Sequence, residues 1–295
     1  MSKLIFREYI GVKPSSTNLH DFPTDIINSK ISDFHFILGF ASEGYENGKG
    51  NGIFKEAWDV EFFGLEKVKK LKENNPKVKV VISIGGRDVE TPFDPAEEEI
   101  WIRQAVNSLK AIIQKYKNDS NPNRNLIDGI DINYQHIAES TTESLFSHCL
   151  GEVITKLKRD SDLNIDVVSI APSEKNQSHY RRLYWDNAKM INWVDYQFYN
   201  QIKTISSPAE FVELYNNVAN EYGPNKVLPG VSTDPDDTKN TKISRENFIA
   251  GCILLKQSST LPGVFFWNAN DSAVPLPGGK EGFLLERFWQ SLVTE

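Results

Sequence analysis

The stretch DGIDINYQ, residues 128–135, decides how the rest of the chain is interpreted. It follows Leu126 and Ile127 and alternates apolar with polar side chains, which is typical of a strand with one apolar face. Acidic side chains on a buried strand are costly, so this strand indicates a site that uses Asp131. It nevertheless ends in two amides, Asn133 and Gln135, where two further acids would continue the pattern.

Short apolar segments recur along the whole chain and are separated by amphipathic helical patterns. The predicted strands are residues 4–12, 34–41, 78–86, 126–134, 164–172, 193–200, 226–233 and 263–269. The predicted helices are residues 58–75, 96–116, 142–160, 179–191, 208–223, 244–257 and 281–293. The helix at 96–116 is the clearest, because acids occupy its first turn and lysines its last, as the helix dipole favours.

Strands that alternate with helices predict a parallel sheet, and eight such repeats predict an α/β fold that closes as a (β/α)8 TIM barrel. The sequence contains no linker and no internal repeat, so we expect one domain over residues 1–295. Several predicted strands end in polar or aromatic clusters, such as SIGG, DINYQ, QFYN and FWNAN. These ends predict the carboxyl-terminal rim of the barrel, where such folds place their sites.

Composition excludes several classes of function. The 295 residues carry a net charge of −7 without a basic cluster, which argues against a nucleic-acid partner. No apolar run reaches the roughly 18 residues that cross a membrane, and the first residues do not resemble a secretory signal. The two cysteines, Cys149 and Cys252, predict buried thiols in a reducing compartment. We therefore expect a cytoplasmic monomer without metal or cofactor.

Five motifs carry a resemblance to a known family. They are SIGG at 83–86, the stretch at 128–135, DYQFYNQ at 195–201, FFWNA at 265–269, and Tyr9 with Gly11 near the end of the first strand. In this order and at these strand ends, they resemble the family 18 glycoside hydrolases, the chitinase-like barrels, over essentially the whole chain. Longer phrases, including FREYIGVKP, INWVDYQF, STDPDDTK and GVFFWNANDS, resemble the narbonin-type seed globulins of legumes within that family.

The resemblance implies that the catalytic motif is degenerate. In the family, the last position of the strand-four motif holds a glutamate that protonates the leaving oxygen, and an aspartate two residues earlier assists the substrate's N-acetyl group. Here these positions hold Gln135 and Asn133, and a carboxamide neither donates such a proton nor carries negative charge. Asp128 and Asp131 remain as supporting residues, so we expect no catalytic residue and no glycosidase activity.

The resemblance also implies candidate residues for binding a chito-oligosaccharide. They are Tyr9, Phe40, Ser83, Gly85, Gly86, Arg87, Tyr134, Gln197, Tyr199, Asn200 and Trp267. A flat ring such as Trp267 packs on a pyranose face, and the family often has non-proline cis peptide bonds nearby, here expected at Gly39–Phe40 and Phe266–Trp267.

Other polar residues near the strand ends carry weaker expectations. We expect Glu8, Asp88, Glu174, Asp195, Asp234, Asp236, Asp237 and Asp271 to be solvated loop acids or helix caps. The DPDD tract at 234–237 could alternatively bind a hard cation. Arg87, which follows the Gly-Gly of strand three, could fill the floor of the groove and hydrogen-bond Asp131 or Gln135; the alternative is a surface arginine.

Three functions remain open at this point. The first is a non-enzymatic storage protein of seeds or nodules, in keeping with only two Met and two Cys. The second is a lectin-like binder of N-acetylglucosamine oligomers that kept the groove and lost the acid. The third is a weak hydrolase that recruited another carboxylate. An open aromatic groove would favour binding, and a groove filled by side chains would favour storage.

Overall fold

A computed structural model describes residues 4–12, 19–118, 121–274 and 282–294. Its parallel strands follow the order β1 (Ile5–Ile10), β2 (Asp33–Glu46), β4 (Val78–Gly86), β7 (Gly129–Tyr134), β8 (Val167–Ile170), β9 (Trp193–Tyr196), β10 (Val227–Ser232) and β11 (Gly263–Trp267). Since β1 pairs in parallel with both β2 and β11, the sheet closes on itself. The predicted (β/α)8 barrel is confirmed.

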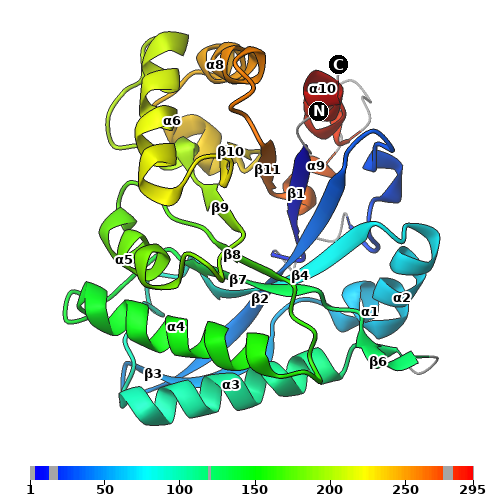
Figure 1. The fold of residues 1–295 in the computed structure, drawn as a ribbon, viewed down its shortest axis with the longest axis vertical. Coiled ribbons are helices and arrows are strands. Elements are labelled where there is room, and N and C mark those ends of the chain that lie inside the picture. The colour runs from blue at the N-terminus through cyan, green and yellow to red at the C-terminus, as the bar shows by residue number, and fades with distance from the viewer. Residues whose placement is uncertain (1–3, 13–18, 119–120, 275–281, 295) are drawn as a thin grey trace.

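Helices follow the barrel strands and surround them (Figure 1). They are α1 (Val60–Phe63), α2 (Leu65–Asn74), α3 (Glu98–Gln114), α4 (Glu143–Arg159), α5 (Gln177–Asn187), α6 (Pro208–Tyr222), α7 (Pro235–Asn240), α8 (Arg245–Gln257), α9 (Ala269–Ser272) and α10 (Leu284–Thr294), with 3-10 turns η1 (Thr24–Ile26) and η2 (Phe198–Asn200). Within the described ranges, no helix has the length and apolar character that crossing a membrane requires.

A hairpin that was not predicted extends the second strand. β2 continues to Glu46 and turns back into β3 (Lys49–Glu56), which pairs antiparallel with it. Asn47 and Gly48 form the turn with φ of 51° and 78°, the backbone conformation that an Asn-Gly pair favours in a two-residue hairpin. The Asn-Gly pair in the sequence therefore indicated this turn. β5 (Lys117–Asn118) and β6 (Asn121–Asn125) also pair antiparallel.

Three predicted helix boundaries need correction. The helix expected over 58–75 is two helices separated at Gly64, where an added Cβ would lie 2.2 Å from the carbonyl oxygen of Val60. Residues 235–240, expected as loop, form α7, because the Asp234 side chain accepts a hydrogen bond from the backbone N–H of Asp236. The last helix begins at Leu284, and residue 281 of the prediction lies outside the described residues.

The alternation of strand side chains creates two cores. Inward-facing residues of the barrel form a small apolar cluster that includes Ile5, Tyr9, Phe265 and Trp267. Outward-facing residues join the helices in a much larger core. Cys149 and Cys252 are buried free thiols, as predicted. The polar side chains that point inward share the barrel interior with the small cluster, and these residues define the site.

Candidate site at the carboxyl ends of the barrel strands

Asp131 is the acid at the centre of the barrel. It lies on β7, is fully buried and accepts hydrogen bonds from Tyr9 Oη at 2.8 Å, Ser83 Oγ at 2.7 Å and Ser169 Oγ at 2.7 Å. Burial raises the pKa of Asp131, although the charge of Arg7 and the three hydroxyls oppose the shift. Ser83 and Ser169 lie on β4 and β8, the strands that pair with β7, and Tyr9 reaches across the barrel interior from β1, so three strands hold the carboxylate in place.

Asn133 and Gln135 continue the same strand face above Asp131. Gln135 Nε2 donates to Asn133 Oδ1 and to Gln197 Oε1, both at 2.8 Å. Gln197 in turn donates to the carbonyl oxygen of Ala171 at 2.7 Å and accepts from Asn200 Nδ2 at 3.0 Å. The amide side chains here are therefore linked to one another by hydrogen bonds, and an amide does not act as a Brønsted acid at ordinary pH.

A second set of charges lies inside the barrel, and the sequence analysis did not identify it. Arg7, buried on β1, contacts Asp195 Oδ2 through Nε at 3.0 Å and donates to Ser169 Oγ at 2.5 Å. Asp195 was expected to be a solvated acid, and this expectation is wrong. Burial raises the pKa of Asp195 to about 7; Arg7 opposes the shift and Asp131 adds to it. Arg7 also lies 3.0 Å from Nδ1 of His35, whose pKa burial lowers to about 4, so the neutral ring accepts this hydrogen bond.

Aromatic rings close the upper part of the barrel. The ring centroids of Tyr9 and Phe40 lie 5.2 and 5.9 Å from that of Trp267. Trp267 is 3% exposed, and its indole Nε1 has no hydrogen-bond partner within the described part of the chain. Cis peptide bonds occur at Gly39–Phe40, as expected, and at Trp267–Asn268, one bond later than expected.

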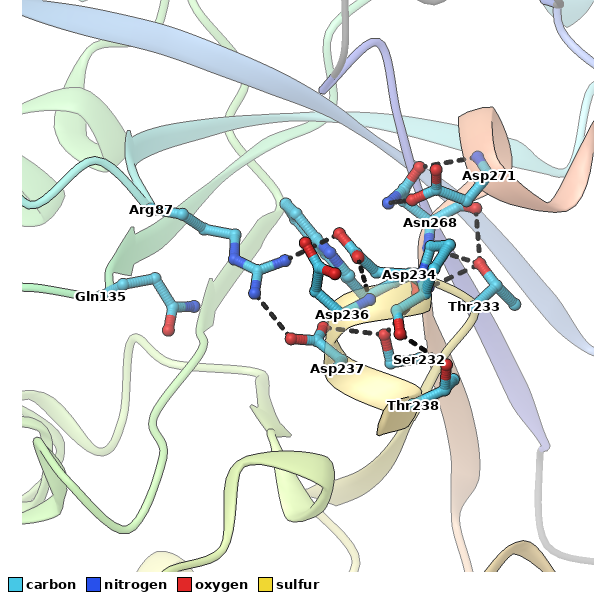
Figure 2. A network of polar contacts seen from close by, with 12 residues as sticks. Arg87, Gln135, Ser232, Thr233, Asp234, Asp236, Asp237, Thr238, Asn268 and Asp271 are labelled. Atoms are coloured by element: carbon cyan, nitrogen blue, oxygen red, sulfur yellow. Dashed lines mark hydrogen bonds and ion pairs between the residues drawn. The ribbon is translucent and has the colours of Figure 1, made fainter. Parts of the chain in front are cut away.

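Arg87 covers this aromatic floor, but not through the contacts that were expected. Its guanidinium lies 5.2 Å from the centre of the Trp267 ring, and Figure 2 shows it directed at the acids of the 234–237 tract. Arg87 donates to Asp234 Oδ2 at 3.2 Å and to Asp237 Oδ1 at 2.6 Å. The expected hydrogen bond to Asp131 or Gln135 is therefore corrected to an ion-pair bridge with the loop after β10. We call Arg87, Asp234 and Asp237 the Arg87 bridge.

The acids of the 234–237 tract are engaged by protein groups. Asp237 also accepts from Ser232 Oγ at 2.8 Å, Asp234 caps α7, and Asp236 is exposed beside Lys239. Asp234 and Asp237 are buried, which corrects the expectation of a solvated loop acid for Asp237, while Asp234 is a helix cap, the other role that was expected. The alternative of a hard-cation site in this tract gains no support, because its buried carboxylates already hold a cation, the Arg87 guanidinium.

Three other predicted residues do not form part of the aromatic floor. The Tyr134 side chain belongs to the outer core, where its hydroxyl donates to Glu43 Oε2 at 2.7 Å, so it does not face the aromatic floor. Gly85 has a φ of 103°, and a Cβ there would lie 2.7 Å from the carbonyl oxygen of Asn133. Gly85 thus permits the close approach of β4 to β7, while a Cβ at Gly86 would meet only Phe40, at 3.9 Å.

A cavity of about 360 Å³ adjoins the Arg87 bridge at Asp237. It lies between β10, α7 and the start of α8, and Tyr199, Asp237, Arg245 and Phe248 contribute to its wall. Neither Trp267 nor Gln135 lines it. In the described part of the chain, side chains that could share a metal ion come together at Glu98, Glu99 and His148, which are exposed on α3 and α4 and separate from the motif.

Comparison with known proteins identifies the class that this fold and motif define. The description Glycosyl hydrolases family 18 matches residues 18–243, and the chain belongs to this family. Chitinase 1 of Tulipa saxatilis subsp. bakeri is 34% identical over 281 residues, which cover 92% of this chain and 82% of that protein. The RuBisCO-associated protein of Glycine max is 28% identical over 251 residues, covering 80% and 81%.

Solved structures give the same result. The catalytic domain of a family 18 chitinase from the fern Peteris ryukyuensis is 33% identical with a TM-score of 0.82, covering 99% of this chain and 100% of that one. A family 18 chitinase from Crocus vernus is 30% identical with the same TM-score and coverage. The expected membership of a family that includes plant chitinases is confirmed.

Proposed function

We propose that this chain is a family 18 barrel without glycosidase activity that serves as a narbonin-type reserve protein of seeds or nodules. The observation that carries the proposal is Gln135, which stands in the position of the family's acid and uses its amide hydrogens on Asn133 and Gln197. A group that cannot lose a proton forfeits a contribution of about 10²–10⁴ to the rate. Asn133 likewise lacks the charge that would stabilise a developing cation.

The Arg87 bridge supports the same proposal. A pyranose that stacked on Trp267 would need the ring face that the Arg87 guanidinium covers at 5.2 Å. Two carboxylates hold the guanidinium there, and one of the two contacts is as short as 2.6 Å. The groove is therefore filled by a side chain at its floor, which favours storage over sugar binding.

Hydrolysis of N-acetylglucosamine tetramer and hexamer tests the absence of activity. We expect no products above the buffer background, even at micromolar protein. Hydrolysis that disappears in Asp234→Asn or Asp237→Asn would instead support the residual hydrolase with a recruited carboxylate.

Immunodetection through seed filling and germination tests the reserve role. Fractionation of the same samples tests the predicted cytoplasmic location. A constant low level throughout would contradict a reserve function.

Binding of chito-oligosaccharides is the second candidate. The aromatic floor is retained, and the Trp267 Nε1 has no acceptor within the described residues, so it could donate to a ligand once Arg87 moved off the ring. A related family 18 chitinase from Cycas revoluta was solved as a mutant in complex with (GlcNAc)4. Calorimetric titration with the tetramer and hexamer separates the two candidates. Saturable micromolar to low-millimolar binding supports the binder, and no heat with no competition supports the reserve protein.

A further inference from the structure

An acidic side chain on β1 faces the helices rather than the barrel interior. Glu8 follows the outward alternation of Phe6 and Ile10 and is fully buried. Its neighbours in register are Phe36 on β2 and Phe266 on β11. Neither of its carboxyl oxygens has a hydrogen-bond partner among the residues that the structure describes. Glu8 was expected to be a solvated acid or a cap, and its burial corrects that expectation.

A second buried acid belongs to the helix that covers this part of the barrel. Glu286 on α10 is also fully buried. Within the described residues neither carboxyl oxygen makes a well-formed hydrogen bond, although the Ser272 hydroxyl and the backbone N–H of Glu286 lie near enough to lower its pKa in part. One turn further, Gln290 accepts from the backbone N–H of Asn28 at 2.9 Å, while its Nε2 has no partner. Figure 1 shows α10 beside the amino-terminal strand, and Glu286 is close enough for its charge to act on Glu8.

One described cation acts on this pair from α10. Arg287 partly opposes the raised pKa of Glu286, while its guanidinium donates to Asp25 and to the carbonyl oxygen of Gly282. The strands around Glu8 contribute apolar side chains, and the Ser272 hydroxyl of α9 lies near Glu286. Two carboxylates in such surroundings would be largely desolvated and mutually repulsive, which is unfavourable.

We propose that Glu8 and Glu286 form a proton-dependent clasp that holds α10 against the barrel when both carboxyl groups are protonated and releases it when they ionise. The clasp lies on the outside of the barrel and is independent of the function proposed for the groove. Neutral carboxyl groups fit the dry interface, whereas ionised ones gain most by moving to water. Release of α10 provides that movement, because a helix end unfolds locally at less cost than the barrel.

The direction of the pH effect follows from the burial of both groups. Burial raises the pKa of Glu286, which the nearby Ser272 hydroxyl only partly offsets, and burial together with Glu286 raises the pKa of Glu8. The folded protein therefore binds more protons than the unfolded chain, in which glutamate titrates at about 4.3. The stability from the pair is complete below this pH and is lost as the pH rises through the raised values.

Hydrogen exchange of the α10 amides at pH 5 and pH 8.5, corrected for the intrinsic pH dependence of exchange, tests the clasp. We expect opening of α10 to become at least about tenfold more frequent at the higher pH in the wild-type protein, a change equivalent to one unit of pKa. Glu8→Gln and Glu286→Gln keep the shape and remove the charge, so we expect both to abolish this increase. Glu213→Gln, at an exposed position on α6, is the matched control and should behave as the wild type.

The clasp is contradicted if α10 of the wild type is equally protected at both pH values, or if the two variants show the same increase as the control. A measurement on the unaltered protein guards against variants that fail to fold. The side-chain carboxyl resonances of Glu8 and Glu286 in 13C-glutamate-labelled protein, assigned by their loss in the two Gln variants, should titrate above those of exposed glutamates such as Glu213. Titration of every glutamate near its ordinary pH would overturn the proposal.

Discussion

Position 135 illustrates how one functional group sets the chemistry of a barrel. The amide of Gln135 has two hydrogens to donate, and the oxygens of Asn133 and Gln197 accept them. A glutamate in the same place would bring only acceptors to these two oxygens in its ionised form. The surroundings thus accept both hydrogens of an amide, and we expect that a glutamate at this position alone would not create a catalytic arrangement.

We expect Asn133→Asp with Gln135→Glu to remain without measurable hydrolysis of N-acetylglucosamine hexamer. Adding Arg87→Ala to the pair should bring hydrolysis above background, because the substitution uncovers the Trp267 ring on which the sugar would stack. Product analysis by chromatography measures both variants. Equal activity with and without Arg87 would show that the Arg87 bridge does not obstruct the groove.

Asp195 predicts a pH dependence of stability that originates inside the barrel. Its pKa of about 7 exceeds that of an unfolded aspartate, about 3.9, so the folded state holds an extra proton between these values. The free energy of unfolding should therefore fall with rising pH over this window, by up to about 1.4 kcal/mol per pH unit. We expect Asp195→Asn to remove this component, as measured by urea unfolding from pH 4 to 8. An unchanged slope in the variant would assign the effect to other groups.

At the scale of elements, side-chain caps place the helix ends. Thr142 accepts a hydrogen bond from the backbone N–H of Leu145 and begins α4, Ser207 does the same for α6, and Ser244 for α8. A single residue can also interrupt a helix: Gly64 has an extended backbone conformation and separates α1 from α2. The Arg87 bridge joins the end of β4 to the start of α7, because Asp234 caps α7 and also accepts a hydrogen bond from Arg87.

Thr142→Ala should reduce the free energy of unfolding by about 1 kcal/mol, because the first turn of α4 loses the acceptor for one backbone N–H. Thr142→Ser keeps the hydroxyl and should cost only a small part of that. Urea denaturation at a fixed pH compares the two variants. A similar loss in both would mean that the threonine methyl group, not the cap, stabilises this end of α4.

At the scale of the whole molecule, the barrel depends on the contact between its first and last strands. Ile5 on β1 pairs with Gly263 on β11, and the N–H of Ile5 donates to the carbonyl oxygen of Pro262 at 3.0 Å. The strands approach so closely that a Cβ at Gly263 would lie 1.9 Å from the carbonyl oxygen of Ile5. Closure therefore requires the absence of a side chain at this position.

Gly263→Ala should destabilise the protein by several kcal/mol or prevent its accumulation in soluble form, since neither backbone can move without opening the barrel. Gly48→Ala is the matched control, because a Cβ there has nothing within 4 Å and only the φ of 78° opposes it. We expect the control to cost about 1 kcal/mol. Thermal unfolding monitored by circular dichroism compares them, and equal losses would contradict the steric account of closure.

The sequence by itself determined the barrel and the amides at positions 133 and 135. Alternation along strands and the period of helices are local properties, so they predicted every barrel strand and most helices, although a readable Asn-Gly turn was missed. The amides at 133 and 135 needed only the position of the strand face. What the tertiary structure alone decided is which remote side chains meet.

Arg87 pairs with acids 147 and 150 residues away in the sequence. Arg7 pairs with Asp195 inside the barrel, and Glu8 lies near Glu286 of α10. Sequence periodicity reports which face of an element a residue occupies, and it does not report what lies opposite that face. Barrel closure sets those pairings, because it brings strand ends and helices from distant parts of the chain to one rim or one interface.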